Sequence, residues 1–416
     1  MQVGADTPAA TPDRGSAAGN GTDVVIVGGC GRAGLPLGLA LAARGLSVVL
    51  YDINAEAVEK VNASRMPFAE QDAGPLLTEV ARAGRLRATT AAAGVGMAEH
   101  VIVVVGTPVD EHLSPDLGAV PRSLERCLEH LRDGQLIVLR STIHPGVTAL
   151  TERMLQRHGY AVDVAFCPER ISEGRALTEL FTLPQIVAAR TPQASARAEK
   201  LFRHLTEQIV LLTPEEAELA KLFTNTWRYV KFATANQFWM MANDAGLDYE
   251  RIQHAVTYGY PRAADLPGPG FAAGPCLLKD TMQLAAFHQN NFVLGHAAMM
   301  INEGLPLYLV SKLATRYDLA ELTVGILGMA FKGGSDDPRD SLAYKLRKLL
   351  LLRAAEVLCT DPYVADQRLL PLPEVLARSD LLVIGSPHQV YADVTGEAGD
   401  TPVVDIWGIT KQGVTV

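Results

Sequence analysis

The chain lacks the features of a secreted or membrane-spanning protein. Its five cysteines are odd in number and widely scattered, without a C-x-x-C pair or a histidine cluster, which predicts reduced thiols and no zinc site. No apolar run reaches the length needed to cross a bilayer. Residues 1–22 have no apolar signal-peptide core, so we expect a disordered lead-in. These absences together predict a cytoplasmic protein.

The chain also lacks any block of Lys or Arg residues, and its net charge is −9. An acidic chain of this kind suits neither nucleic acid nor an anionic membrane as a partner, although a local positive patch can still hold a small anion. At 416 residues it is too long for one ordinary core, so two or three domains are expected.

The first ordered stretch predicts a dinucleotide-binding fold. The apolar run 23–27 leads into a G-x-G-x-x-G turn and a helical pattern, a setting in which backbone N–H groups and the helix dipole bind a pyrophosphate. A second apolar run, 47–51, ends at Asp52, where a carboxylate accepts both ribose hydroxyls of an adenosine and repels a 2′-phosphate. The pattern favours NAD over NADP; the alternative is an ordinary glycine turn. The glycines concerned are Gly29, Gly31 and Gly34.

Further apolar runs alternate with helical stretches, which is typical of a parallel sheet covered on both faces. The runs are 100–105, 135–139 and 162–166, and the helical stretches are 74–83, 120–131 and 147–158. Ligands bind at the carboxyl ends of such strands. The segments 106–108, 141–142 and 167–173 follow the strands, and we expect them to converge on one edge of the sheet.

A long helix is predicted in the middle of the chain. Thr213-Pro-Glu-Glu216 has the form of a capping box with Pro at the first helical position, and the pattern continues to Ala245. Lys221 and Asn225 are four residues apart and share one face. The helix is mostly apolar around them, which favours burial at a domain or subunit interface over a solvated surface.

The loop 266–280 contains three glycines and three prolines and carries Cys276. Such a loop presents a thiol to ligands, because glycines permit close approach and prolines fix the shape. Lys279 and Asp280 stand just before a helical run at 281–288. The ammonium group of Lys279 and the helix N-terminus would both favour the thiolate. The alternative is a free, buried cysteine.

The last hundred residues predict a second α/β unit with strands at 323–327, 356–359, 381–384 and 403–405. Its glycine pattern after the first strand is broken, so we expect no second NAD there. The loop that follows carries Lys332 and Arg339, which are candidates for binding phosphates, or else ordinary surface cations.

Several motifs recur in order from about residue 23 to the C-terminus. They are GCGRAGLPLG (29–38), GTP (106–108), ST (141–142), PERISEG (168–174), ELAKLFTN (218–225), GFAAGPCLLKD (270–280) and LGMAFKGGSDDPRDS (327–341). In this order and spacing the chain resembles the UDP-glucose/GDP-mannose dehydrogenase family.

The resemblance implies an α/β fold with two Rossmann-like parallel-sheet domains joined by a long central helical dimerisation region. We expect an NAD-binding domain at 23–212, a central helical domain with the cysteine loop at 213–312, and a nucleotide-sugar-binding α/β domain at 313–416. A homodimer or larger homo-oligomer follows from the same likeness.

The activity implied is an NAD-dependent, four-electron oxidation of the C6 hydroxymethyl group of UDP-glucose or TDP-glucose to the uronic acid. By the resemblance, Asp280 and a water held by Thr142 remove the hydroxyl proton, and Lys221 with Asn225 stabilises the oxyanion.

Cys276 then attacks the aldehyde, giving a thiohemiacetal that is oxidised to a thioester. Glu169 activates water for the final hydrolysis.

Two sets of binding residues are carried over from the family. For NAD they are Gly29, Gly31, Arg32, Ala33, Gly34, Asp52, Thr107, Thr142, Glu173 and Arg339. For the nucleotide sugar they are Glu169, Arg170, Lys221, Asn225, Arg262, Gly270, Phe271, Phe331 and Lys332, with Arg262 expected from the partner subunit.

Departures from the family pattern leave the substrate open. Lys279 and Asp280 resemble glucose-type members, whereas Pro267-Gly-Pro-Gly resembles members that act on N-acetylhexosamines. Trp407 stands close to where many relatives place an arginine near the nucleotide. The alternatives are therefore a UDP-N-acetylhexosamine 6-dehydrogenase of the N-acetylmannosamine type, a single-step alcohol or hydroxyacid dehydrogenase with Lys221 as the base, and a non-catalytic sugar-nucleotide sensor.

Overall fold

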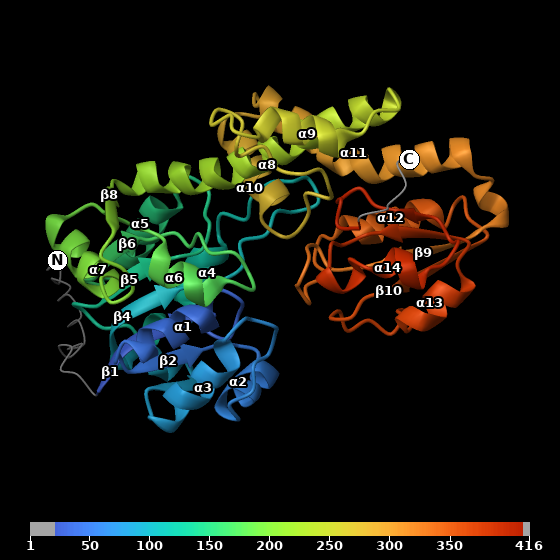
Figure 1. The fold of residues 1–416 in the computed structure, drawn as a ribbon. Coiled ribbons are helices and arrows are strands. Elements are labelled where there is room, and N and C mark those ends of the chain that lie inside the picture. The colour runs from blue at the N-terminus through green and yellow to red at the C-terminus, as the bar shows by residue number, and fades with distance from the viewer. Residues whose placement is uncertain (1–20, 411–416) are drawn as a thin grey trace, which may run out of the picture. The chain divides into compact units, whose positions relative to one another are not determined.

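The structure is a computed structural model that describes residues 21–410 (Figure 1). The expected lead-in therefore lies outside the described residues, except that Thr22 already belongs to the first strand. By its internal contacts the chain forms two compact units. The first contains the described residues up to Thr107 together with Leu117–Glu218, and the second contains Pro108–Asp116 and the described residues from Leu219 onward.

The first unit is built on an eight-stranded sheet in the order β3-β2-β1-β4-β5-β6-β7-β8. All neighbouring strands are parallel except β6 and β7, which are antiparallel, so the expected parallel sheet has one reversed pairing. The strands are β1 Thr22–Val27, β2 Val48–Tyr51, β3 Leu86–Thr89, β4 Ala98–Val103, β5 Leu136–Leu139, β6 Asp163–Phe166, β7 Gln185–Ala189 and β8 Ile209–Leu212.

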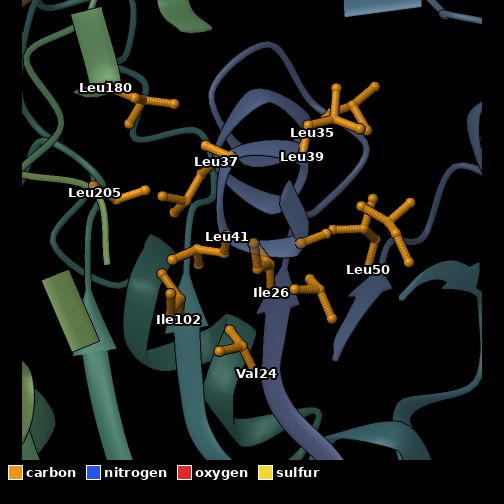
Figure 2. Packing of buried hydrophobic residues seen from close by; sticks show 14 of the residues in the cluster. Val24, Ile26, Leu35, Leu37, Leu39, Leu41, Leu50, Ile102, Leu180 and Leu205 are labelled. Atoms are coloured by element: carbon orange, nitrogen blue, oxygen red, sulfur yellow. The ribbon is translucent and has the colours of Figure 1, made fainter. Parts of the chain in front are cut away.

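Helices pack on this sheet. They are α1 Gly34–Ala43, α2 Ala55–Asn62, α3 Ala73–Arg82, α4 Ala119–Glu125, α5 Val147–Arg157, α6 Ala176–Thr182 and α7 Pro192–Phe202, with short 3-10 helices at Ala92–Met97 and Leu128–His130. α1 is buried from Gly34 to Ala42, which is why its sequence is apolar all round rather than amphipathic. In Figure 2, Leu37 of α1 lies on the side of Leu180 and Leu205, and Leu35 lies on the opposite side of the helix.

The second unit combines long helices with a small parallel sheet of order β10-β9-β11-β12. Its strands are β9 Thr323–Leu327, β10 Glu356–Thr360, β11 Leu381–Ile384 and β12 Val403–Val404. Its helices are α8 Pro214–Asp244, whose first turn belongs to the first unit, α9 Tyr249–Thr257, α10 Leu277–Phe287, α11 Val293–Arg316, α12 Leu342–Leu350, α13 Leu372–Arg378 and α14 Val394–Glu397; a 3-10 helix lies at Leu319–Glu321 and another at Gln389–Tyr391.

One sequence expectation is wrong on length: within residues 21–410, α11 is long and apolar enough to cross a membrane by length and composition alone. Buried core helices pass the same test. α11 also carries Asn302, which is buried, and Glu303, whose carboxylate binds the ammonium group of Lys345 on α12 at 2.9 Å. The ion pair joins α11 to α12 within the second unit.

The predicted capping box at the start of α8 is present. The Glu216 carboxylate accepts hydrogen bonds from the backbone N–H and the hydroxyl of Thr213, at 2.8 and 2.9 Å, and the backbone N–H of Glu216 donates back to the hydroxyl at 3.4 Å. α8 ends before Gly246, whose φ of +67° suits glycine.

We predict that Thr213→Ala lowers the free energy of unfolding by about 1 kcal/mol, because it removes both side-chain contributions to this cap. Urea unfolding followed by tryptophan fluorescence measures the change, since two of the three tryptophans, Trp227 and Trp239, lie on α8. The control is Thr234→Ala on the same helix, where the lost hydrogen bond is an interior one to Val230. Equal destabilisation by both variants would contradict the role of the cap.

Candidate active site

The glycine turn after β1 is shaped by close packing at two of the three glycines of the G-x-G-x-x-G pattern. A Cβ atom at Gly29 would lie 2.7 Å from the Ile26 carbonyl oxygen, and one at Gly34 would lie 2.5 Å from that of Gly28. At Gly31 the nearest neighbour would be 3.4 Å away. Gly31 thus leaves room above the start of α1, as the approach of a pyrophosphate requires.

Asp52 lies directly after β2, where the sequence places the ribose-binding acid. Its Oδ2 atom accepts the backbone N–H of Cys30 at 2.9 Å and its Oδ1 atom accepts that of Asn54 at 3.0 Å. Each oxygen of a carboxylate has about two lone-pair sites, so each keeps one for a ribose hydroxyl. The turn and this acid fit the adenosine half of NAD.

The loops after β4 and β5 are tied together at the same edge of the sheet, as the sequence predicts. The Thr107 hydroxyl donates to the Thr142 carbonyl oxygen at 2.5 Å. The Ser141 hydroxyl accepts the N–H of Val105 at 2.8 Å and donates to the Val105 carbonyl oxygen at 2.7 Å.

Two further residues assigned to NAD lie close to each other. The guanidinium group of Arg32, which follows Gly31, is 3.8 Å from the Glu173 carboxylate and lies over the Phe68 ring at 5.0 Å. The glycine turn is thereby linked to the loop after β6.

Glu169 is held by an arginine that the sequence did not single out. Arg140, at the end of β5, is the largest fully buried side chain in the described residues. Its guanidinium group binds Glu169 Oε2 through Nε at 2.9 Å and Nη2 at 2.6 Å, and also donates to the carbonyl oxygen of Cys167 and to Gln185. A buried cation needs such partners, so Arg140 fixes the Glu169 carboxylate.

The other Glu169 oxygen accepts the backbone N–H groups of Arg170 and Ile171, at 2.7 and 3.1 Å. The Arg170 guanidinium group donates to the Pro184 carbonyl oxygen, and burial lowers its pKa. Arg170 therefore also ties the loop after β6 to the start of β7.

In the second unit, the polar residues of α8 meet the first turn of α10. Lys221 and Asn225 are buried, as expected from the apolar residues around them, and Asp280 is completely buried. The Asn225 amide donates to Asp280 Oδ2 at 2.5 Å, and the Lys279 ammonium group lies 2.7 Å from Oδ1. The structure thus joins Asn225 and Asp280, two of the predicted catalytic side chains, and Lys221 lies one turn before Asn225 on α8.

Cys276 is exposed, whereas the other cysteines, Cys30, Cys127, Cys167 and Cys359, are buried. Burial raises the pKa of each of these four thiols, to about 12 for Cys30 and Cys167 and about 11 for Cys127 and Cys359. α10 begins at Leu277, four residues earlier than expected, so Lys279 and Asp280 lie within it and Cys276 is its N-cap residue. The helix dipole therefore acts directly on this thiol.

The cysteine loop is anchored at Gly270 by Asn236, a residue on α8 that the sequence analysis did not identify. Its side chain accepts the N–H of Gly270 at 2.8 Å and donates to the Gly270 carbonyl oxygen at 3.0 Å. It also donates to Asn302, which in turn donates to the Tyr229 carbonyl oxygen. All three side chains are fully buried.

Aromatic rings cover the same loop. A Cβ atom at Gly270 would lie 2.2 Å from the Trp407 ring, and one at Gly274 would lie 2.4 Å from the Phe331 ring. Trp407 also meets Phe271 edge to face, with ring centroids 5.9 Å apart. Both glycines are also at positive φ, +146° and +95°. A larger residue is therefore excluded both by the neighbouring ring and by the backbone conformation.

The remaining substrate and cofactor candidates of this unit lie on two segments, one partly buried and carrying Phe331, Lys332 and Arg339, the other exposed and carrying Arg262. Lys332 lies over the Phe331 ring at 5.7 Å, and Arg339 binds the buried Asp337 carboxylate through Nη2 at 2.5 Å. Arg262 is exposed beside Tyr260. The predicted site residues therefore form one set in each compact unit.

Comparison with known proteins finds three matched domains in order along the chain. Residues 23–206, 215–304 and 325–412 match, in turn, the NAD binding, central and UDP binding domains of the UDP-glucose/GDP-mannose dehydrogenase family.

Curated relatives and solved structures agree with these matches. The chain is 33% identical over 387 residues to the UDP-N-acetyl-D-mannosamine dehydrogenase of Pyrococcus horikoshii, covering 90% of this chain and 91% of that protein. The structure of the UDP-D-ManNAc dehydrogenase from P. horikoshii superposes with a TM-score of 0.86 at 30% identity, over 94% of this chain and 97% of the other. That of a UDP-glucose dehydrogenase from Pyrobaculum islandicum gives 0.84 at 27% identity, over 93% and 94%.

We predict that Asn236→Leu loosens the cysteine loop, because both hydrogen bonds to Gly270 are lost while the side-chain size is nearly kept. Cys276 should then react with iodoacetamide several-fold faster, measured by mass spectrometry of the Cys276 peptide. The control is Asn243→Leu on the same helix, whose amide donates to the Tyr308 hydroxyl and not to the loop. Unchanged labelling in Asn236→Leu would show that the loop is held elsewhere.

Proposed function

Because the chain belongs to the UDP-glucose/GDP-mannose dehydrogenase family, we propose that it oxidises C6 of a UDP-N-acetylhexosamine of the N-acetylmannosamine type to a carboxylate. NAD is the cofactor of the family, and the substrate is a nucleotide sugar. The observation that carries the chemistry is the exposed Cys276 thiol at the N-cap of α10, a helix whose first turn also carries the buried Asp280 that binds Asn225.

The substrate proposal replaces our first expectation of UDP-glucose or TDP-glucose. The relatives that match over nine-tenths of the chain carry the name UDP-N-acetyl-D-mannosamine dehydrogenase. The Pro267-Gly-Pro-Gly segment points the same way. A solved UDP-glucose dehydrogenase superposes almost as well, so the shared fold does not discriminate between the two sugars.

The first oxidation needs a base and an oxyanion site. NAD, when bound, accepts the hydride from C6 in each of the two oxidations. Asp280 takes the hydroxyl proton, and Lys221 and Asn225 stabilise the resulting alkoxide. Asn225 can do this while it binds Asp280, because an amide NH₂ group has two donors.

The second oxidation passes through Cys276. Its thiolate forms a C–S bond with the aldehyde carbon, and the carbonyl oxygen becomes an alkoxide held by the same donors. Loss of a second hydride from this carbon leaves a thioester. Glu169, fixed by Arg140, then takes a proton from water, the water oxygen bonds to the thioester carbon, and the thiolate leaves. Two hydrides are lost for each carboxylate formed.

We expect two NADH for each UDP-N-acetylmannosamine consumed, and much slower turnover of UDP-glucose, TDP-glucose and GDP-mannose. The measurement is NADH absorbance against carboxylate product by mass spectrometry across this panel. One NADH per sugar would support the single-step dehydrogenase instead. Binding of NAD and sugar without turnover would support the non-catalytic sensor.

Cys276→Ala should abolish carboxylate formation, and Cys276→Ser should stall with aldehyde or with a covalent adduct, because serine is a poorer nucleophile and leaving group. Intact-protein and product mass spectrometry detect these outcomes. Cys359→Ala, which removes a buried thiol of the same unit, should keep the two-NADH yield. Carboxylate formation by Cys276→Ala would overturn the thioester route.

We also propose that α8 is the core of a homodimer. Three of its large apolar side chains are more than half exposed: Phe223 at 53%, Trp227 at 58% and Met241 at 61%. A solvated helix rarely carries such a set, and a second copy of the chain would cover it.

Trp227→Glu is predicted to shift the protein to monomers, since a carboxylate cannot be buried in an apolar interface without a partner. Light scattering after gel filtration measures the mass. Leu352→Glu, at another highly exposed apolar side chain, should leave the mass unchanged. A monomeric wild-type protein would contradict the dimer outright.

A further inference from the structure

The starting point is His388, a fully buried histidine that neither the sequence analysis nor the proposed mechanism uses. Its Nδ1 atom is 3.0 Å from the backbone nitrogen of Gly334, and its Nε2 atom is 3.0 Å from Asp361 Oδ2. A backbone N–H can only donate, so Nδ1 must be the acceptor. Nε2 is then the ring nitrogen that donates, and it is directed at Asp361.

Gly334 belongs to the loop after β9 that carries Phe331 and Lys332, and His388 belongs to the segment after β11. The two segments lie against each other at two further points. A Cβ atom at Gly328 would lie 2.7 Å from Ser386, and one at Gly333 would lie 2.2 Å from the Pro387 carbonyl oxygen. The first half of the loop after β9 thus packs against residues 386–388.

The loop after β10 supports the histidine from the other side. Asp361 Oδ2 accepts the N–H groups of Met329 and Ala330 at 2.6 and 3.0 Å in addition to His388, and its Oδ1 atom accepts those of Tyr363 and Val364. Burial opposes ionisation of this acid, but these hydrogen bonds prevail and lower its pKa to about 2. Asp361 is a permanent anchor for the imidazole.

Asp361 occupies the place after its strand that Asp52 occupies in the first unit. Asp52 accepts two backbone N–H groups and keeps lone pairs for a ligand, whereas Asp361 has five protein donors and its side chain is fully buried. The acid of the second unit therefore organises loops.

We propose that His388 is a positioning residue that sets the affinity of the second unit for a nucleoside diphosphate, by holding the Phe331–Gly334 loop through the Gly334 N–H. The proposal rests on the proposed function, in which Phe331 and Lys332 bind the diphosphate side of the substrate. Gly333 and Gly334 have no side chains that could fix their backbone. The hydrogen bond from the Gly334 N–H to the His388 imidazole therefore holds this end of the loop in place. Lys332 is two residues from Gly334, close enough for a loosened loop to misplace its ammonium group.

Two substitutions separate the two hydrogen bonds of His388. The side-chain oxygen of Asn can take the position of Nδ1 and accept the Gly334 N–H, whereas the amide nitrogen of Gln reaches the position of Nε2 and donates to Asp361. Both remove a buried ring, so each controls for the packing loss of the other.

The experiment measures UDP binding by calorimetry, and KM and kcat with UDP-N-acetylmannosamine. We expect His388→Gln to bind UDP about three- to tenfold more weakly, with a matching rise in KM and little change in kcat, as the loss of one hydrogen bond predicts. His388→Asn should bind UDP within about twofold of the wild type. Equal losses in both variants, or none in either, would overturn the proposal.

A second measurement does not depend on either variant folding. Hydrogen exchange of the wild-type peptide spanning residues 331–336 should retain a slow amide, because the Gly334 N–H is bonded to a buried ring although Gly334 itself is exposed. Complete exchange at the rate of a free loop would contradict the anchor.

Lys332→Gln tests the underlying function separately. If Lys332→Gln binds UDP as tightly as the wild type, the diphosphate role of Lys332 is wrong, whatever the histidine variants do. If Lys332→Gln weakens binding but His388→Gln does not, the function stands and the positioning role of His388 is wrong.

Discussion

The pair of hydrogen bonds between the Asn236 side chain and the Gly270 backbone is the constraint on which the second unit depends. It fixes the cysteine loop to the long helix α8, and Asn302 extends the same network to α11. Because Asn236 fixes the loop at Gly270, the other end of the loop can expose the Cys276 thiol while the loop keeps its shape. A buried amide network of this kind favours one arrangement of the loop, because the loss of any partner leaves an unsatisfied polar group in the core.

The charged groups follow the same logic in both units. Asp280 is buried with Lys279 and Asn225 around it, and Glu169 is held by Arg140, whose guanidinium group is itself buried. Fixed donors around a carboxylate replace the water that would otherwise have to reorganise during a reaction. The acids assigned to proton transfer and to water activation are therefore set in place before any substrate arrives.

Much of the fold could be predicted from local patterns, because strand, glycine turn, helix and acid follow each other within short stretches. Local patterns do not predict β3, β7 and β8: β3 contains the exposed Arg87 among its four residues, β7 contains Gln185 and two alanines, and two of the four residues of β8 are exposed. The start of α10 at Leu277 is also hard to predict, because the glycines and prolines just before Cys276 are typical of a loop.

The partners inside the sites were beyond sequence reasoning for a different reason. Arg140 binds residues 29 and 45 positions away, and Asn236 binds a glycine 34 positions away. No spacing rule links such pairs, so they become visible only when the chain is folded.

The position of Trp407 has a consequence for how the protein is made. Its ring lies on Gly270, and its indole N–H donates to the Ile384 carbonyl oxygen at the end of β11. The cysteine loop is thus completed by a residue near the C-terminal end of the described chain. During synthesis Cys276 emerges from the ribosome before Trp407 does, so the cysteine loop gains its covering ring only after most of the second unit has been made.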